Sequence, residues 1–390
     1  MVHYDPYAPE MIENPYPVYA RMREEAPVYR LEQWGAWALA RFEDVWNLSA
    51  EVDVTSVASG NTTSHVLTKV QPPTPMFALM DPPAHTKVRS AVGRVFTPRS
   101  VARLSADLEQ WVAEIFDAAG DEIDIVTDLG TPIAVRVASR LMGIADEEGL
   151  ELVKLTKRFF ARDPEVDGIT EDSLAAMGEM VEQFLEILAA RRKSGERGKD
   201  AISALLAVEV DGVPRPDTAI ADDLVLLMNG GTDTFPKVLA NLVRRLGQAP
   251  EQRDQVHCDR ALLDDAFLEA VRVDMPTQHL CRVMLKDWTV RGETLRRGEP
   301  VLFLYASANR DEREFVDPDR FDIARRPVRH LGFGHGTHAC IGRHAAALEA
   351  RACVGALLDR APGYEVVEER AERLYTDFVQ GYASLPVRIR

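Results

Sequence analysis

One stretch near the C-terminal end, residues 330–342 with the sequence HLGFGHGTHACIG, constrains the fold of this chain most strongly. Its glycines allow the backbone to take positive φ and to approach a bulky flat ligand closely. The next run, residues 343–351, is rich in Ala and Leu and is predicted to be a helix. Cys340 therefore lies where a loop enters a helix, and the positive end of the helix dipole favours the thiolate. We expect freed backbone N–H groups to point at this sulfur, as the surroundings of a metal-bound thiolate require.

A single cysteine is usually a small buried hydrophobic residue, so its spacing to other residues decides the interpretation. Here the pattern Phe-Gly-x-Gly-x-His-x-Cys-x-Gly is complete from Phe333 to Gly342. It resembles the haem-binding signature of the cytochromes P450, in which the cysteine is the proximal iron ligand. The resemblance implies that Cys340 ligates the iron of haem b, within a site that includes Phe333, His338 and Gly342. In such enzymes the thiolate pushes electron density onto iron and favours O–O cleavage.

Composition narrows the possible partners of the chain. Its 390 residues are 46% hydrophobic, which is ample for a large core, and its formal net charge is −16. That charge argues against nucleic acid or anionic lipid as a general partner. The sequence contains no apolar run long enough to span a membrane, and its first residues do not resemble a signal peptide. Four cysteines without regular spacing are typical of a reducing compartment, so we expect a cytoplasmic protein.

A pair of basic side chains follows the sequence Asp81-Pro82-Pro83 at the start of a predicted helix. His85 and Arg89 are four residues apart, so they share one helix face and could clamp a carboxylate. Alone, such a pair is usually just solvated. In this context it resembles the P450 segment whose His and Arg hold the haem propionates. The same resemblance implies that Arg282, from a strand, and His338, from the signature loop, also reach a propionate.

A long helix is predicted from Asp217 or Thr218 to about Leu246, and its centre breaks the usual helix rules. Two consecutive glycines and Pro236 fall within residues 229–236, and Pro236 leaves the carbonyl of Thr232 without its helical partner. The helix should kink or open there. A purely structural kink is the simpler interpretation, but helix rules also fail where a ligand must fit.

An acid–alcohol pair, Asp233 and Thr234, lies beside this predicted opening. The stretch resembles the central P450 helix that crosses the distal face of the haem. By that resemblance Thr234 would hydrogen-bond iron-bound dioxygen and Asp233 would relay protons, which O–O cleavage requires. The next two residues, Phe235 and Pro236, replace the small or hydroxylated residues more usual in the family, and so bear on the local helix geometry.

Glu269 and Arg272 are three residues apart on a predicted helix, which alone would be worth only a few tenths of a kcal/mol. Together with Arg320 further along the chain, they resemble the P450 Glu-x-x-Arg helix and its later Arg-bearing segment. The resemblance implies that Glu269, Arg272 and Arg320 form a buried ionic frame. Breaking such a frame costs about 3–5 kcal/mol because charges are left unpaired.

Residues 51–80 are rich in Ser, Thr and Pro without a sustained period, and such long irregular stretches are usually functional or disordered. In the P450 family this interval covers the substrate pocket, so residues 63–80 become a candidate specificity region. The C-terminal tail resembles the hairpin whose tip lines that pocket. The candidate substrate contacts are Val66, Phe77, Leu227, Gly231, Gln278, His279 and Phe378.

The resemblance covers nearly the whole chain and implies a mainly α fold, the P450 fold, in one helix-rich domain (1–390) with small β-sheets. It implies a monooxygenase that inserts one atom of O2 into a small to medium organic substrate by hydroxylation or O-demethylation. Electrons would come from a separate ferredoxin and ferredoxin reductase. A basic docking patch for an acidic ferredoxin is predicted on the thiolate side. Its members are Arg94, Arg99, Arg343, His344 and Arg351.

Three alternatives remain open at this point. A peroxide-driven haem–thiolate oxidase would share Cys340 but would not need the Asp233–Thr234 pair. A catalytically silent P450-like recruitment module should lack the pair or the ligand, and this chain keeps both. A helical scaffold without haem would be colourless when purified.

Overall fold

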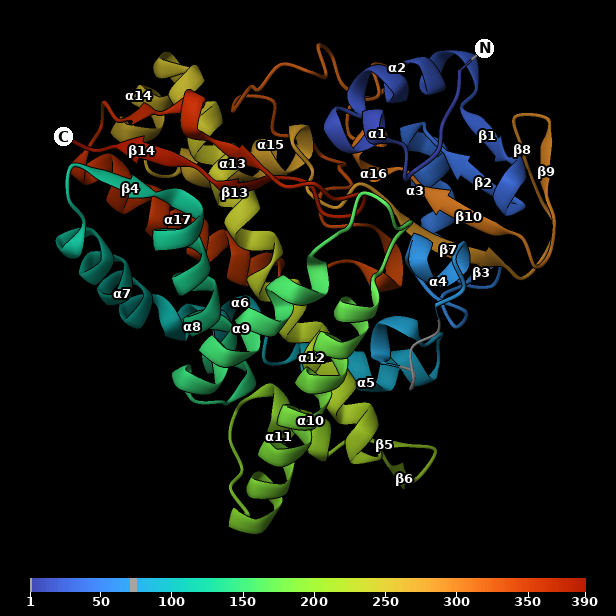
Figure 1. Ribbon diagram of the computed structural model, residues 1–390, viewed down its shortest axis with the longest axis horizontal. Helices are drawn as coiled ribbons and strands as arrows, with labels where there is room; N and C mark the ends of the chain where they lie inside the picture. Colours follow the sequence, from blue (N-terminus) through green and yellow to red (C-terminus); the bar gives the residue numbers. More distant parts are fainter. Residues whose placement is uncertain (1, 71–75) are drawn as a thin grey trace.

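The computed structural model describes residues 2–70 and 76–390, and these residues are mostly helical with short strands (Figure 1). The α-helices are α1 (Pro9–Glu13), α2 (Tyr16–Glu25), α3 (Phe42–Ala50), α4 (Thr63–Val66), α5 (Ala84–Gly93), α6 (Pro98–Val101), α7 (Ser105–Ala118), α8 (Thr131–Met142), α9 (Asp146–Phe160), α10 (Glu171–Ser194), α11 (Ala201–Leu206), α12 (Asp217–Thr232), α13 (Thr234–Gln248), α14 (Pro250–Cys258), α15 (Leu262–Val273), α16 (Tyr305–Ala308) and α17 (Arg343–Arg360). Short helical turns that matter for the site are η2 (Phe77–Leu79), η4 (Ile125–Gly130) and η5 (Gly336–His338). The strands are β1 (Val28–Leu31), β2 (Ala36–Leu39), β3 (Thr55–Ser56), β4 (Glu122–Asp124), β5 (Glu209–Val210), β6 (Val213–Pro214), β7 (Leu280–Met284), β8 (Trp288–Val290), β9 (Glu293–Leu295), β10 (Pro300–Phe303), β11 (Glu365–Val366), β12 (Glu372–Arg373), β13 (Tyr382–Ser384) and β14 (Pro386–Arg388).

The largest sheet of the described residues joins strands from residues 28–56 to strands from residues 280–303, in the order β1-β2-β10-β7-β3. Strand β10 runs parallel to β2, with Val301 beside Trp37, and the other pairings are antiparallel. Every residue of β2 and β10 is buried, as expected for central strands that are covered on both faces. The antiparallel β1–β2 pair is connected through a short helical turn that ends at Trp34 and is followed by Gly35.

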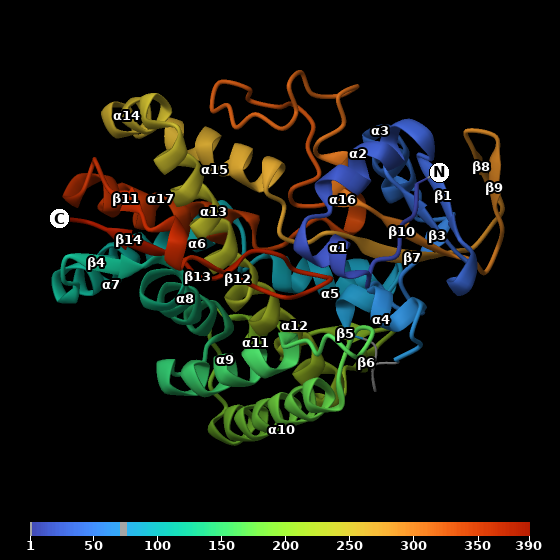
Figure 2. The same ribbon diagram turned by 45° about the horizontal axis from the view of Figure 1, so that its top comes forward.

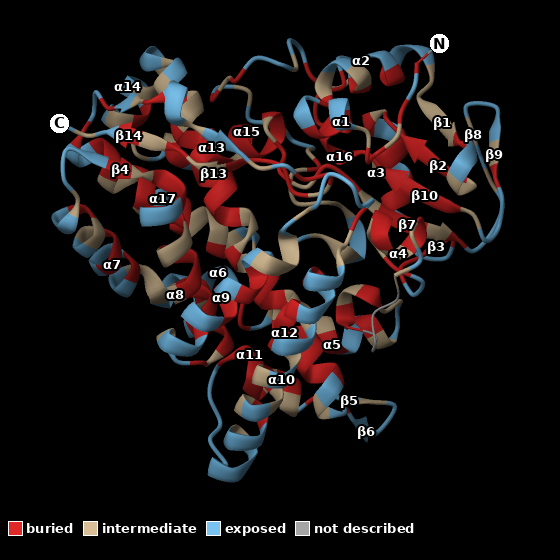
Figure 3. Ribbon diagram, in the orientation of Figure 1, coloured by how far each residue is buried: buried red, intermediate tan, exposed pale blue. Residues whose placement is uncertain are grey.

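Helix α12 lies inside the helical half of the molecule and is packed against α8, α9, α10 and α11 (Figures 1 and 2). Most of its residues are buried, which Figure 3 shows as a largely red ribbon. A helix that is apolar on nearly all sides must be enclosed by others, because no polar face remains for solvent.

The predicted long helix is interrupted, as its sequence indicates. Helix α12 ends at Thr232, α13 begins at Thr234, and Asp233 alone separates them. Pro236 has no N–H to donate to the carbonyl of Thr232, so one helical hydrogen bond is missing at this junction. The backbone of Asp233 stays near helical dihedrals, with φ −89° and ψ −40°, and α13 therefore continues close to the direction of α12.

The loop that carries Cys340 lies between the two hydrophobic clusters of the described residues. Leu331 is fully buried in the cluster built on the large sheet, whereas Phe333 and Ile341 pack against the helical cluster. The loop is therefore fixed from both sides of the molecule. In the part of the chain that the structure describes, no helix is long and apolar enough to cross a membrane.

Candidate functional site

The backbone of the Cys340 loop is closed by its own hydrogen bonds. The N–H of Cys340 donates to the carbonyl of Phe333 at 2.7 Å, and the N–H of Gly334 donates to that of Leu331 at 2.9 Å. Gly336 has φ +76°, and a Cβ there would lie 2.7 Å from the carbonyl oxygen of Ser49 on α3. Both the dihedral and the close approach require glycine at this position.

Cys340 comes just before α17, whose first residue is Arg343. Burial raises the pKa of the Cys340 thiol, while the backbone N–H groups of Gly342 and Arg343 donate to the sulfur and act in the opposite direction. The positive charges of Arg89 and Arg343 also lower it. Cys340 nevertheless keeps exposed surface. The donors that the sequence predicts around this sulfur are present.

Four basic side chains converge beside this loop from separate elements. His85 and Arg89 come from α5, Arg282 from β7 and His338 from η5. The rings of His85 and His338 lie 4.1 Å apart between centroids, and Arg89 donates to the carbonyl of Ala339. The sequence therefore predicts correctly that these four residues lie together.

Arg89 and Arg282 of this cluster donate to backbone carbonyls and form no ion pair with a described residue, although the carboxylate of Asp81 acts on His85. Burial first, and then the nearby arginines, lower the pKa of His338 to about 3 and also lower that of His85. Both ring nitrogens of His85 are buried without a hydrogen-bond partner among the described residues. Buried donors are normally paired, so this basic cluster fits a ligand that carries carboxylates. The two propionates of a haem meet that requirement.

The central helix offers an open face near the acid–alcohol pair. Gly230 is exposed although its neighbours Met228 and Asn229 are buried, and a Cβ on it would meet nothing within 4 Å. Asp233 and Thr234 follow at the junction of α12 and α13, both half-buried. A glycine with open space beside it on an otherwise enclosed helix fits the close approach of a flat cofactor.

Asp233 is engaged in an ion pair that sequence reasoning missed. Its Oδ2 accepts from the Nζ of Lys237 at 2.5 Å, and both side chains are largely buried. The spacing of four residues along one helix was the available signal. The resemblance did not direct attention to it, because the family pattern ends at Thr234.

The ionic frame differs from the prediction in one residue. Glu269 and Arg272 form a fully buried bidentate pair, with N–O distances of 2.7 and 2.8 Å. The third member is Arg325, whose Nε donates to Oε1 of Glu269 at 3.0 Å. The prediction of Arg320 was wrong: its side chain is exposed, and only its carbonyl accepts from Arg272 and Arg325. The two arginines lie on the same irregular segment, so no periodicity distinguishes them.

This frame also holds the start of the signature loop. Arg272 donates to the carbonyl of Asn309 at 2.7 Å, and the side-chain oxygen of Asn309 accepts from the N–H of Leu331 at 2.8 Å. The buried ion pair is thus linked through one asparagine to the segment that leads to Cys340.

The predicted substrate contacts fall into separate groups. The N–H of Gln278 donates to the carbonyl of Phe378 at 2.9 Å, and the ring of His279 meets that of Phe378 edge-on at 6.2 Å. Phe77 is held to α12 through its N–H, which donates to Asp223 at 2.6 Å. Leu227 and Gly231 lie one turn apart on α12, and Val66 is buried in the other hydrophobic cluster. Pro72, Pro73 and Pro75 of the predicted specificity region lie outside the described residues.

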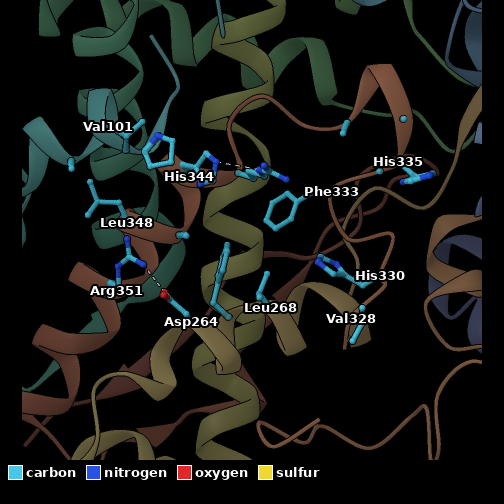
Figure 4. Close-up of a pocket in the computed structure, with 18 of the residues that line it drawn as sticks. Val101, Asp264, Leu268, Val328, His330, Phe333, His335, His344, Leu348 and Arg351 are labelled. Carbon is cyan, nitrogen blue, oxygen red and sulfur yellow. Dashed lines mark hydrogen bonds and ion pairs between the residues drawn. The ribbon is translucent and has the colours of Figure 1, made fainter. Parts of the chain in front are cut away.

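A hollow of about 780 Å³ opens next to the Cys340 loop (Figure 4). Phe333 and His335 line it from the loop, and Arg343 and Arg351 from α17. In Figure 4 the side chains of Asp264 and Arg351 point toward each other, and they form an ion pair of 2.6 Å. His344 of the predicted basic patch also lines the hollow, whereas Arg94 and Arg99 lie exposed on the chain around α6.

Comparison with known proteins identifies the family. The family model described as Cytochrome P450 matches residues 164–361. A putative cytochrome P450 123 of Mycobacterium tuberculosis is 33% identical over 390 residues, covering 99% of this chain and 96% of the relative. The chain belongs to the cytochrome P450 family. Linalool 8-monooxygenase of Pseudomonas putida is 30% identical over 395 residues, with 96% and 95% covered.

The P450 fold, predicted from the sequence, is confirmed by solved structures. A mutant of P450 EryK in complex with erythromycin B superposes with a TM-score of 0.89 at 26% identity, over 98% of each chain. The protein is thus a bacterial P450 monooxygenase whose cofactor is haem b, and it uses redox partners, O2 and an organic substrate. Three features of the structure fit that cofactor: the Cys340 loop, the basic cluster in which the ring nitrogens of His85 have no partner among the described residues, and the open face at Gly230.

Proposed function

We propose that this P450 inserts one oxygen atom of O2 into a small to medium organic substrate, by hydroxylation or O-demethylation. One observation carries the proposal: the acid–alcohol pair Asp233–Thr234 sits at the single break in an otherwise buried helix, next to the open face at Gly230. A chain that kept only a silent binding role would not need an ionisable pair at this junction.

The cofactor would be held by residues of three elements and the loop. Cys340 would ligate the iron, and His85, Arg89, Arg282 and His338 would pair with the propionates. When bound, the haem supplies the oxygen-activating chemistry. The protein orients it through the fixed loop, and the N–H groups of Gly342 and Arg343 temper the charge on the sulfur.

Protons would reach the reaction through the interrupted helix. The Thr234 hydroxyl can donate one hydrogen bond and accept another, so it can orient a reacting oxygen. The Asp233 carboxylate can take a proton from the solvent side and pass it on, as a positioned general acid does. The missing helical hydrogen bond at Thr232 leaves backbone room for a water between them.

Electrons would come from an acidic ferredoxin that binds over the hollow beside Cys340. Arg94, Arg99 and Arg343 are exposed, and none forms an ion pair with a described residue. Arg351, by contrast, is neutralised by Asp264. Three unpaired arginines on the thiolate side of a chain with net charge −16 favour an anionic partner at this one place.

The substrate is expected to be mostly apolar with one or more polar groups. Phe77 and Leu227 contribute apolar surface near α12, whereas Gln278 and His279 are buried polar residues near Phe378. Burial lowers the pKa of His279 to about 4, so its ring is neutral at pH 7. A neutral imidazole can donate and accept one hydrogen bond each.

The proposal is tested by reconstitution. Compounds are first screened for a change in the visible absorption spectrum of the haem-loaded protein on binding. A compound that binds is then incubated with NAD(P)H, a ferredoxin and its reductase, and the products are analysed for one added oxygen or a lost methyl group. Product formed only with the electron-transfer proteins supports the proposal. Equal product with hydrogen peroxide alone, and no dependence on Asp233 or Thr234, would instead favour the peroxide-driven oxidase.

A further inference from the structure

Lys237 is buried one helical turn beyond Asp233. Its side chain is only 6% exposed, and its Nζ pairs with Oδ2 of Asp233, whose side chain is 11% exposed. Lysine is rarely this enclosed unless a specific partner compensates for lost hydration. The proposed function gives Asp233 a partner in Thr234 and no role to this lysine.

The position of Lys237 is built by three parts of the chain. Gly381, near the C-terminus, leaves room for the lysine stem: a Cβ on Gly381 would lie 2.7 Å from Cβ and 2.8 Å from Cγ of Lys237. The Nζ lies 5.6 Å from the ring centroid of Phe160 at the end of α9. The lysine stem thus lies against a glycine on one side, and its ammonium lies near an aromatic ring on another. These two contacts hold the ammonium in one place.

The other charges that face Lys237 compensate one another. Arg162, which follows α9, pairs with Asp377 of the C-terminal segment at 3.0 Å, and both are buried. Burial lowers the pKa of Lys237, Asp233 raises it, and Arg162 lowers it further. Because Asp377 is engaged by Arg162, Asp233 is the carboxylate that balances Lys237 among the described residues.

We propose that Lys237 is a positioning residue that fixes the Asp233 carboxylate and controls its proton transfer to Thr234. This inference rests on the proposed relay role of Asp233. The ammonium directs the carboxylate along α13, so the relay works when the pair opens or when Lys237 hands a proton to Asp233. In that second step the N–H bond of Lys237 breaks, an O–H bond forms on Asp233, and solvent reprotonates the amine.

The test replaces Lys237 by Met, which keeps the stem and removes the charge. The Asp233→Asn/Lys237→Met double variant is measured beside it. We expect product formed per NAD(P)H to fall roughly tenfold, and the pH profile of coupling to change because the cation beside the relay is gone. The substrate-induced spectral shift and turnover with peroxide should stay unchanged.

Four further variants make the result decisive. Lys237→Arg should restore coupling, and Lys154→Met, at an exposed surface lysine, should change nothing. Lys237→Gln serves if the Met variant does not fold, since it keeps a donor without the charge. The double variant should be no worse than Asp233→Asn alone, because coupled residues are not additive.

Other outcomes separate the two ideas. Lys237→Met and Lys237→Gln could both lose peroxide-driven turnover, substrate binding and thermal stability together. That result would overturn the positioning role and leave Lys237 as a structural residue. Unchanged coupling in Lys237→Met with reduced coupling in Asp233→Asn would overturn the inference alone. Unchanged coupling in Asp233→Asn would overturn the proposed relay itself.

Discussion

At Cys340, burial and hydrogen bonding act on the same sulfur in opposite directions. Burial disfavours the thiolate, whereas two backbone N–H groups and two arginines favour it. A bound metal cation shifts this balance decisively, because a coordinating thiol is deprotonated outright. The residue that defines the sequence signature is thus prepared for a metal by its neighbours.

Replacement of Cys340 by Ala should abolish the thiolate-type band in the reduced carbon-monoxide difference spectrum. The reason is that no other sulfur is available at the loop: Cys281 and Cys353 are buried elsewhere, and Cys258 lies at the end of α14. The matched control, Cys258→Ala, should leave the spectrum intact. A retained thiolate band in Cys340→Ala would contradict the assignment.

Glu349, buried in α17, should make the stability of the protein depend on pH. Burial raises its pKa from 4.5 to about 8, so the folded state keeps a proton that the unfolded chain releases. The contribution of this bound proton to the free energy of unfolding is therefore complete below pH 4.5, and it is lost as pH rises toward 8. The loss is at most about 1.4 kcal/mol per pH unit across this window.

Urea unfolding of Glu349→Gln at pH 5 and pH 8 measures this effect. The free energy of unfolding of the variant minus that of the natural chain should be larger at pH 8 than at pH 5. The reason is that glutamine has no charge to bury. Glu186→Gln, at an exposed glutamate of α10, should show no such difference. Identical pH dependence of the Glu349 variant and the natural chain would show that Glu349 is ionised without cost.

At the scale of elements, the sequence predicts where helices break, but it does not predict which residues form buried ion pairs. Pro236 and two glycines predicted the α12–α13 break, because a missing N–H is a local property. The third member of the ionic frame is a property of tertiary packing. Arg320 and Arg325 lie on one irregular loop, and only the folded structure shows which one reaches Glu269. The four-residue spacing of Asp233 and Lys237 is present in the sequence, but only the structure shows that the pair is buried and therefore energetically important.

The two loop arginines should differ in their effect on stability. Arg325→Gln should lower the free energy of unfolding by about 1–3 kcal/mol, since it removes a charged hydrogen bond to the buried Glu269. Arg320→Gln should change it by no more than about 0.5 kcal/mol, because that side chain is exposed and only its backbone takes part. Chemical denaturation of both variants decides the matter, and the reverse ranking would restore Arg320 to the frame.

At the scale of the whole molecule, a strongly acidic chain carries exposed arginines on segments that flank the signature loop, and they remain the predicted docking patch for an electron donor. Family resemblance predicted the P450 fold, and the basic residues on the segments that flank the signature loop predict where the patch would lie. It did not predict that Arg351 would be neutralised by Asp264, since these residues are far apart in sequence. The hollow beside the loop likewise depends on how α6, α15 and α17 meet.

Charge reversal should therefore act most strongly at the unpaired arginines. Arg99→Glu and Arg343→Glu should slow ferredoxin-dependent reduction at low salt, with the difference fading at high salt as the charges are screened. Stopped-flow reduction over a salt series is the measurement. Arg197→Glu, at an exposed arginine between α10 and α11, is the control. Equal rates for all variants at low salt would count against a basic docking patch.

The large sheet has a consequence for the order of assembly on the ribosome. Strands β1 and β2 are made early, but their neighbour β10 emerges only after the whole helical interval has been synthesised. Closing so long a loop costs entropy before the strand contacts return it, and such distant pairings form slowly. We therefore expect the nascent helices to collapse first. Until β10 is made, the β1–β2 hairpin has an unpaired edge at β2. That edge is where a chaperone would protect the newborn chain.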